Sequence, residues 1–254
     1  MSVQTGEQPN IYNEYDNYAW FWNKYWGRTS ARKVLPVIEK VWQPSTNAPL
    51  SLLDVCCGTG QLAQLLSKRG MCSSGIDGSP AMIQFAKKNN PDGQFVVGDI
   101  RESFGFDVSF DAACSFFDSL NHITSPEELL QVFQHICNAL RPGGKFLFDL
   151  NMEEGYLHRW NNQAFQIVQD DHVCVDTMVF DSSSQIGTNQ VTLFLKTDIW
   201  ERLDVTIIER CYSAEQITFL LSQAGFGSIE MWEASAEFGF KDEYGRYYIH
   251  CIKQ

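Results

Sequence analysis

Short apolar runs alternate with segments of helical periodicity over roughly the first 150 residues of the chain. An apolar run bounded by turn residues is typical of a buried strand, while apolar residues three or four positions apart indicate a helix. Strands are therefore expected at about 51–56, 72–77, 94–98, 110–116 and 145–150. Strands that alternate with helices in this way predict an α/β fold with a parallel sheet and crossover helices.

The predicted helices between these strands begin and end at typical residues. Ser79 and Ser125 are each followed by a proline, and a serine cap with proline in the first turn is a common helix start. Leu62, Leu65 and Leu66 repeat at helical spacing, and Gly70 is expected to end their helix. The segment "RPGG" is expected to end the helix that begins after Ser125.

The pattern changes after residue 150. Residues 164–181 and 190–212 are rich in β-branched and aromatic residues, and a turn-like segment separates them, which predicts an antiparallel meander. Residues 213–226 return to a helix that starts with Ser213 and Gln216 at capping-box spacing, and residues 228–234 and 247–253 form two last strands. Because no Pro-rich linker or repeat borders the meander, it is interpreted as an insertion into one domain.

Composition and charge narrow the range of functions. The chain has 19 basic and 31 acidic residues, a net charge of -12 and no Lys/Arg cluster, so a nucleic-acid partner is not expected. The 8 cysteines fall mostly in apolar runs, which is typical of the reducing cytoplasm, and no His, Cys, Asp or Glu set has metal-ligand spacing. Neither a signal peptide nor a membrane-spanning run is recognised. We therefore expect a cytoplasmic protein without a metal.

Candidate chemistry begins at "LLDVCCGTGQLAQLL", residues 52–66. Gly58, Gly60 and Ala63 fit the G-x-G-x-x-G/A turn, in which the backbone approaches a ligand and a helix N-terminus faces an anion. Asp77 follows at the end of the second predicted strand, where a carboxylate can accept both hydroxyl groups of a ribose. This pattern fits a nicotinamide cofactor or another adenosine compound.

Two further aspartates favour an adenosine compound with an ammonium group. Asp54 lies four residues before Gly58, where a carboxylate would repel a pyrophosphate but suits an amino group. Asp99 follows the third strand and is placed to accept from an adenine amino group, with Ile100 against the ring. The alternative interpretation is that these aspartates cap turns and that the glycines serve backbone geometry alone.

The ordered motifs "LDVCCGTGQLA", "GIDGSPAMIQFA", "VVGDI", "FDAACSFFDSLNHI" and "LRPGGKFLFDLN" resemble those of class I S-adenosylmethionine-dependent methyltransferases. The resemblance covers residues 51–151. It implies a Rossmann-like, doubly wound sheet of seven strands whose last strand is antiparallel, and S-adenosylmethionine as the cofactor. It also places further residues at the cofactor, namely Cys56, Gly78, Met82 and Phe116.

The segment "AWFWNKYWGRTSARKVL" is similar to the N-terminal lid of the glycine N-methyltransferases and of the sugar-amine N-methyltransferases. In those families a tryptophan, and an arginine ten residues later, close over the methionine part of the cofactor. The matching residues are Trp22 and Arg32. An arginine suits a carboxylate and an aromatic face suits a sulfonium, although the aromatic residues here also fit the apolar face of a docking helix.

The expected layout is one domain over residues 1–254. It consists of a helical lid at 11–45, a cofactor-binding core at 51–151, a β insertion over the acceptor site at 160–212, and a last helix and strands at 213–254. Catalysis is expected to depend mainly on positioning, with His122 and Asp118 as the candidate bases and Asp149 as a further one. His122 alternatively bonds only to neighbouring backbone at a helix entry.

The predicted reaction is methyl transfer to a nitrogen or oxygen of a small molecule. Glycine N-methyltransferases carry an arginine after strand five for the substrate carboxylate, whereas Asn151, Glu153 and Glu154 stand there in this chain. That difference favours a neutral or cationic acceptor, with Arg159 as a possible substitute for the arginine. The alternatives are an NAD-dependent oxidoreductase and a module that binds S-adenosylmethionine without catalysis. The sequence gives no prediction of the oligomeric state.

Overall fold

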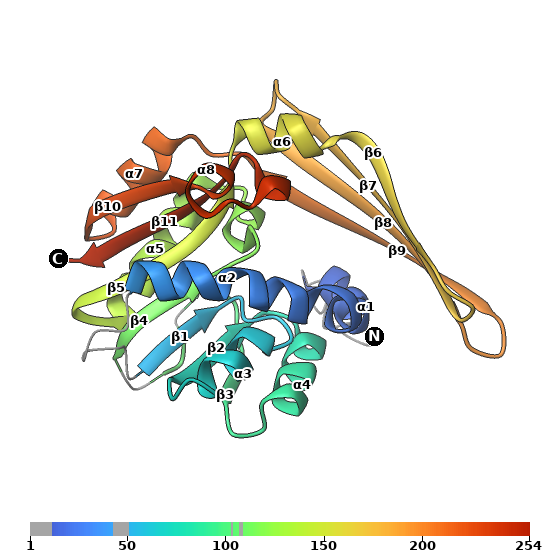
Figure 1. The fold of residues 1–254 in the computed structure, drawn as a ribbon, viewed down its shortest axis with the longest axis horizontal. Helices are drawn as coiled ribbons and strands as arrows, with labels where there is room; N and C mark the ends of the chain where they lie inside the picture. The colour runs from blue at the N-terminus through green and yellow to red at the C-terminus, as the bar shows by residue number, and fades with distance from the viewer. Residues whose placement is uncertain (1–11, 43–50, 103, 107–108) are drawn as a thin grey trace, which may run out of the picture.

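The computed structural model describes residues 12–42, 51–102, 104–106 and 109–254. Its described strands form two sheets (Figure 1). A seven-stranded sheet has the order β10-β11-β5-β4-β1-β2-β3, and a four-stranded sheet has the order β6-β7-β8-β9. Residue 11 and residues 43–45 of the predicted lid lie outside the described residues.

The central sheet agrees with the fold predicted from the sequence. The strands β1 to β5 pair in parallel, while β11 runs antiparallel to both β5 and β10. The predicted seven-stranded sheet with an antiparallel last strand is therefore confirmed. The strands are β1 (Ser51–Val55), β2 (Cys72–Asp77), β3 (Gln94–Val97), β4 (Phe110–Ser115), β5 (Leu140–Asn151), β10 (Phe226–Glu233) and β11 (Arg246–Lys253).

The predicted helix starts are confirmed by their caps. The Ser79 and Ser125 hydroxyls accept from backbone N–H groups at the first turns of α4 and α5, and Ser213 with Gln216 forms a complete capping box. These contacts satisfy donors that the helix itself leaves unpaired. The crossover and C-terminal helices are α3 (Gln61–Ser67), α4 (Pro80–Asn89), α5 (Pro126–Ala139) and α7 (Ala214–Gln223).

The structure differs from the sequence prediction at the start of β5 and in three short helices. β5 begins at Leu140 rather than near residue 145, because the "RPGG" segment forms an irregular start to the strand that includes Gly143 at φ +73°. The sequence did not predict α6 (Glu153–Arg159), α8 (Ala234–Phe238) or the 3-10 helix Lys241–Glu243. Each has seven residues or fewer, too few to show helical periodicity.

The inserted segment is the predicted antiparallel meander. It comprises β6 (Asn161–Val168), β7 (His172–Asp181), β8 (Ile186–Lys196) and β9 (Trp200–Arg210), which pair in sequence order. The four long strands extend from α6 away from the central sheet as an arm (Figure 1). The end of β9 lies next to the core, because the Asn121 side-chain amide donates to the Arg210 carbonyl at 2.8 Å.

The N-terminal helices join the central sheet to the arm. They form one helical segment that runs through α1 (Asn13–Phe21), a π-helix (Trp22–Trp26) and α2 (Gly27–Trp42). The apolar face of α2 packs on the central sheet, whereas Tyr18 and Phe21 of α1 pack against the meander. Trp22, Tyr25 and Trp26, for which a docking-helix face is the alternative interpretation, are partly buried against the same cluster.

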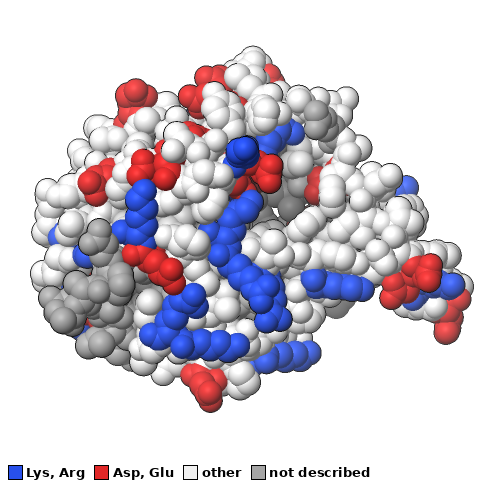
Figure 2. Space-filling model, viewed as in Figure 1, with Lys and Arg blue, Asp and Glu red and all other residues white. Residues whose placement is uncertain are grey.

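The charges on the surface are unevenly distributed. On the face seen in Figure 2, Lys and Arg side chains gather across the middle of the molecule, where α2 lies. This helix carries Arg28, Arg32, Lys33 and Lys40, although the whole chain is acidic. Among the described residues, no helix combines the length and the hydrophobicity needed to cross a bilayer.

Candidate active site

The turn after β1 has the backbone conformation that its glycines predict. Gly58 and Gly60 lie at φ +51° and +73°, in the left-handed region that favours glycine. A Cβ atom at Gly60 would lie 2.8 Å from the Ala86 Cα atom of α4, so a larger residue would push these elements apart. The Gly58 N–H donates to the Asp77 carboxylate at 2.9 Å, which ties the turn to the end of β2.

Asp54 presents a buried carboxylate oxygen to this turn. One oxygen accepts a weak hydrogen bond from the Cys114 thiol at 3.7 Å, and the other, Oδ2, has no hydrogen-bond partner among the described residues. Burial raises the pKa of Asp54 to about 7. A buried acceptor without a donor costs free energy, and an ammonium group supplies both a donor and a charge. This site therefore fits the ammonium group of S-adenosylmethionine.

Asp77 lies at the carboxyl end of β2, where the sequence predicts the ribose. Its two oxygens accept from the backbone N–H groups of Gly58 and Ser79, both at 2.9 Å. Burial raises the pKa of Asp77 to about 6, and the two backbone hydrogen bonds lower it by less. These bonds hold the carboxylate in a fixed orientation and leave further lone pairs for hydroxyl donors.

Asp99 already has strong partners at the end of β3. Arg101 donates to its carboxylate, with the shortest contact at 2.6 Å from Nη2, and the Tyr12 hydroxyl bonds to it as well. Burial opposes these bonds, yet they hold the pKa of Asp99 below its ordinary value. The Tyr12 ring also covers Gly78, where an added Cβ atom would lie 2.1 Å from the ring. Tyr12 therefore occupies the space in which the sequence predicts the adenine.

The N-terminal segment covers the glycine turn, as a lid would. The Gln61 amide donates to the Asn23 side chain at 2.7 Å, and the Trp22 indole nitrogen lies 3.5 Å from where a Gly58 Cβ atom would be. Trp22 is thus close to the predicted methionine position. Arg32 lies on the exposed side of α2, and its contact with the cofactor stays a prediction.

The other predicted cofactor residues differ in position. Phe116 is buried in the core between the sheet and α2, 6.3 Å from the Tyr248 ring. Its neighbour Phe117, at φ +65°, lies 6.0 Å from Trp22 instead. Phe117 is therefore an additional candidate, and the contact of Phe116 with the cofactor stays a prediction.

The remaining predicted cofactor residues follow the carboxyl ends of β1, β2 and β3. Met82 and Ile100 are buried, and Cys56 is half-buried at φ +60° in the turn itself. Burial raises the pKa of the Cys56 thiol well above its ordinary value, so it is a neutral group there. The contacts of these residues with the cofactor stay predictions.

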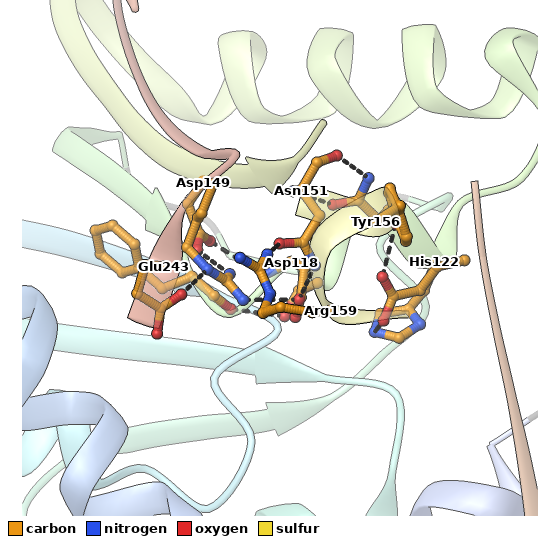
Figure 3. A network of polar contacts seen from close by, with 12 residues as sticks. Asp118, His122, Asp149, Asn151, Tyr156, Arg159 and Glu243 are labelled. Carbon is orange, nitrogen blue, oxygen red and sulfur yellow. Dashed lines mark hydrogen bonds and ion pairs between the residues drawn. The ribbon is translucent and has the colours of Figure 1, made fainter. Parts of the chain in front are cut away.

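Asp118 and Asp149 belong to an ion-pair network (Figure 3). Arg246, on β11, donates to Asp118 at 2.9 Å and also pairs with Asp149, while the Asp118 N–H donates to Asp149 at 3.1 Å. Asn151 donates to Asp118 as well. Burial raises the pKa of Asp149 to about 6, and Arg246 opposes this shift by less. The contacts with Arg246 occupy both carboxylates, which disfavours them as the proton acceptor.

His122 lies in the 3-10 helix Ser119–His122, beside this network. Its Nδ1 atom is 3.0 Å from the Tyr15 hydroxyl of α1, and its Nε2 atom is 3.8 Å from a Glu209 carboxylate oxygen. Burial lowers the pKa of His122, while the charge of Asp118 and a hydrogen bond to the Ile208 backbone raise it by less. The imidazole is therefore neutral at physiological pH, as a base has to be.

Glu209 was not predicted from the sequence. It is buried at the end of β9, where the Tyr156 hydroxyl donates to it at 2.7 Å. Burial and the nearby charge of Asp118 raise its pKa well above the ordinary value. Potential ligand atoms of Asp118, His122 and Glu209 lie within 4.8 Å of one another, a grouping that the spacing of these residues in the sequence did not indicate. Sequence spacing could not reveal a set that joins the loop after β4 to the distant strand β9.

One signal in the sequence could have revealed Glu209. Val205, Ile207 and Glu209 occupy alternate positions of β9 and are buried together, whereas the residues between them are exposed. A charged residue in the inward-facing positions of a strand is rare unless it has a role there.

The comparisons with known proteins agree with this geometry. Residues 52–144 match the family model described as a methyltransferase domain. A putative methyltransferase of Bacillus subtilis, YqeM, is 28% identical over 180 residues, which cover 69% of this chain and 72% of that protein.

Two solved structures share the fold over most of their length. An S-adenosylmethionine-dependent methyltransferase from Clostridium acetobutylicum has a TM-score of 0.75 at 19% identity, with 95% of this chain and 99% of that chain covered. CalS10, an amino pentose methyltransferase from Micromonospora echinaspora solved with S-adenosylmethionine bound, has a TM-score of 0.70 at 18% identity and coverage of 98% and 100%.

The chain is therefore an enzyme that carries a methyltransferase domain, and it has the fold of the S-adenosylmethionine-dependent methyltransferases. The predicted family, fold and enzyme class are confirmed. The oxidoreductase alternative has no support among the matches.

Proposed function

We propose that the protein transfers a methyl group from S-adenosylmethionine to the nitrogen of a small-molecule amine. The cofactor, when bound, supplies a methyl group already activated by a sulfonium centre. The carboxylate of Asp54 binds its ammonium group and Asp77 binds its ribose. The N-terminal segment, over residues 11–45, covers the cofactor and excludes water, so that the reaction depends on position rather than on a strong base.

An amine is proposed as the methyl acceptor because acidic residues surround His122. Asp118 and Glu209 both lie close to the imidazole, and the two described arginines of this network are already engaged. Arg246 is held by carboxylates, and Arg159 donates to the Asn151 side chain at 2.5 Å and to a backbone carbonyl. A cationic amine is the acceptor whose charge complements this site.

Tyr15 lies between the site proposed for the cofactor and the site proposed for the methyl acceptor. Its hydroxyl bonds to His122, and its pKa is raised by burial and by the charges of Glu209 and Asp77, which belong to the acceptor and donor sides. The β insertion, over residues 160–212, supplies Glu209 and covers the acceptor side. The similarity of the fold to CalS10, an amino pentose methyltransferase, supports an amine on a sugar-sized acceptor.

Two measurements test this function. Calorimetry should detect binding of S-adenosylhomocysteine and not of NAD. Purified protein with methyl-labelled S-adenosylmethionine should label amines in a panel of small molecules and leave their hydroxyl analogues unlabelled. Binding without any transfer to the panel or to a cell extract would instead favour the non-catalytic module. A cytoplasmic location and the lack of a nucleic-acid partner remain predictions.

A further inference from the structure

Glu209 is held rigidly at the junction of the two sheets. It lies near the end of β9 with only 4% of its surface exposed, and the Tyr156 hydroxyl of α6 donates to it at 2.7 Å. The next residue, Arg210, accepts through its carbonyl from Asn121, which is the neighbour of His122 in the 3-10 helix. The carboxylate therefore has a fixed position relative to the imidazole.

Among the described residues, no lysine or arginine forms an ion pair with this carboxylate, and the more distant charge of Arg246 offsets its negative charge only in part. Its hydrogen bonds come from the Tyr156 hydroxyl and the Asn151 amide, which are both neutral. Among the described residues, His122 is the basic side chain within 4.0 Å, at 3.8 Å, and burial keeps that imidazole neutral. A buried carboxylate without a charged partner is costly and takes up a proton when no cation is present.

The other acids of the network differ from Glu209 in this respect. Asp118, Asp149 and Glu243 each form an ion pair with the single guanidinium of Arg246. Glu243 also pairs with Lys33, so two cations serve these three carboxylates, and Glu209 is a fourth carboxylate beside them. The site has an excess of negative groups, so one bound positive charge would improve its balance.

On the basis of the proposed amine methylation, we propose that Glu209 binds the ammonium group of the acceptor. An ammonium group beside the carboxylate oxygen that faces His122 Nε2 donates to that oxygen and lies within reach of the imidazole that takes its proton. A metal ion is a poorer occupant, because Asp118 already accepts from Arg246 and Asn151. Glu209 is then the residue that selects amines over hydroxyl acceptors.

The test uses one pair of probes and one pair of variants. The probes are 3-amino-3-deoxyglucose and glucose, which differ in an amine and a hydroxyl. Glu209→Gln removes the charge and keeps the shape, and Glu201→Gln makes the same change at an exposed position of the same strand. Methyl transfer to the amino sugar should fall at least thirtyfold in kcat/KM in Glu209→Gln, since loss of a buried charge partner has effects of that order. Glu201→Gln should match the wild type.

A second measurement requires no turnover. In the complex with S-adenosylhomocysteine, binding of the amino sugar should ionise Glu209 and release about one proton near neutral pH, which calorimetry in buffers of different ionisation enthalpy detects. Glu209→Gln should release none and should bind S-adenosylhomocysteine as the wild type does.

The two proposals fail in different ways. Wild-type methylation of glucose but not of the amino sugar would refute the proposed function. Equal behaviour of the wild type and Glu209→Gln in both measurements would overturn the role of Glu209 alone.

Discussion

Replacing Asp54 with asparagine removes the charge of its carboxylate and keeps the shape of the side chain. Because Oδ2 has no donor among the described residues, the cofactor's ammonium group would be its first charged partner. A hydrogen bond to a charged group contributes about 1.5–3 kcal/mol, and about 1.4 kcal/mol corresponds to a tenfold change in affinity. Affinity for S-adenosylhomocysteine should therefore fall by roughly ten- to 150-fold.

The same substitution should have the opposite effect on the protein without cofactor. Burial raises the pKa of Asp54 from 3.8 to about 7, so the folded protein binds this proton more tightly than the unfolded chain. The free energy of unfolding therefore falls as the pH rises from about 4 to about 7. At about 1.4 kcal/mol per pH unit, the ionised carboxylate costs on the order of 4 kcal/mol above that range. Asp54→Asn does not titrate and should be more stable than the wild type at alkaline pH.

Denaturant unfolding without ligand, at acidic and at alkaline pH, measures this stability, and calorimetric titration measures the affinity. Asp92→Asn, at an exposed turn, is the matched control and should resemble the wild type in both. If Asp54→Asn binds S-adenosylhomocysteine normally and keeps the wild-type dependence of stability on pH, Asp54 is not the ammonium site.

Three further substitutions test the remaining contacts. Asp77→Ala should lower S-adenosylhomocysteine affinity at least tenfold in calorimetry, since it removes the acceptor for the ribose hydroxyls; unchanged affinity would contradict the adenosine site. Tyr12→Ala should raise the rate of cofactor binding in stopped-flow tryptophan fluorescence, by roughly tenfold if one hydrogen bond to Asp99 has to break; slower binding would show that the ring belongs to the bound state. His122→Ala should lower kcat by about 10²–10⁴-fold with little change in cofactor affinity. The acidic limb of the wild-type rate profile, expected below the ordinary pKa of 6.5, should disappear with it; retained turnover would leave positioning as the whole mechanism.

Local signals predicted the fold and the donor side of the site. Helix caps and turn glycines affect only residues that are close in the sequence, so sequence spacing indicates them directly. Examples are the caps Ser79 and Ser125 and the glycines before α3. The sequence did not single out Phe117, because spacing does not encode its left-handed backbone conformation at a non-glycine residue.

The acceptor side could not be predicted because its contacts join distant parts of the chain. His122 and Tyr15 are 107 residues apart in sequence, and Arg246 and Asp118 are 128 apart. Only the folded sheet brings these residues together. For the same reason, the sequence left Asp118 a free base, whereas Arg246 holds it in an ion pair.

The N-terminal segment contacts the donor and acceptor sites through two tyrosines three positions apart, Tyr12 at the N-cap of α1 and Tyr15 within the helix. Tyr12 bonds to Asp99 on the donor side, and Tyr15 bonds to His122 on the acceptor side. Residues at this spacing lie on one face of a helix, so a shift that withdraws one ring moves the other. We therefore expect a compulsory order of addition, in which the methyl donor enters first and its arrival sets the position of Tyr15 before the acceptor binds. Product-inhibition patterns would then show the demethylated cofactor competing with the methyl donor and not with the amine.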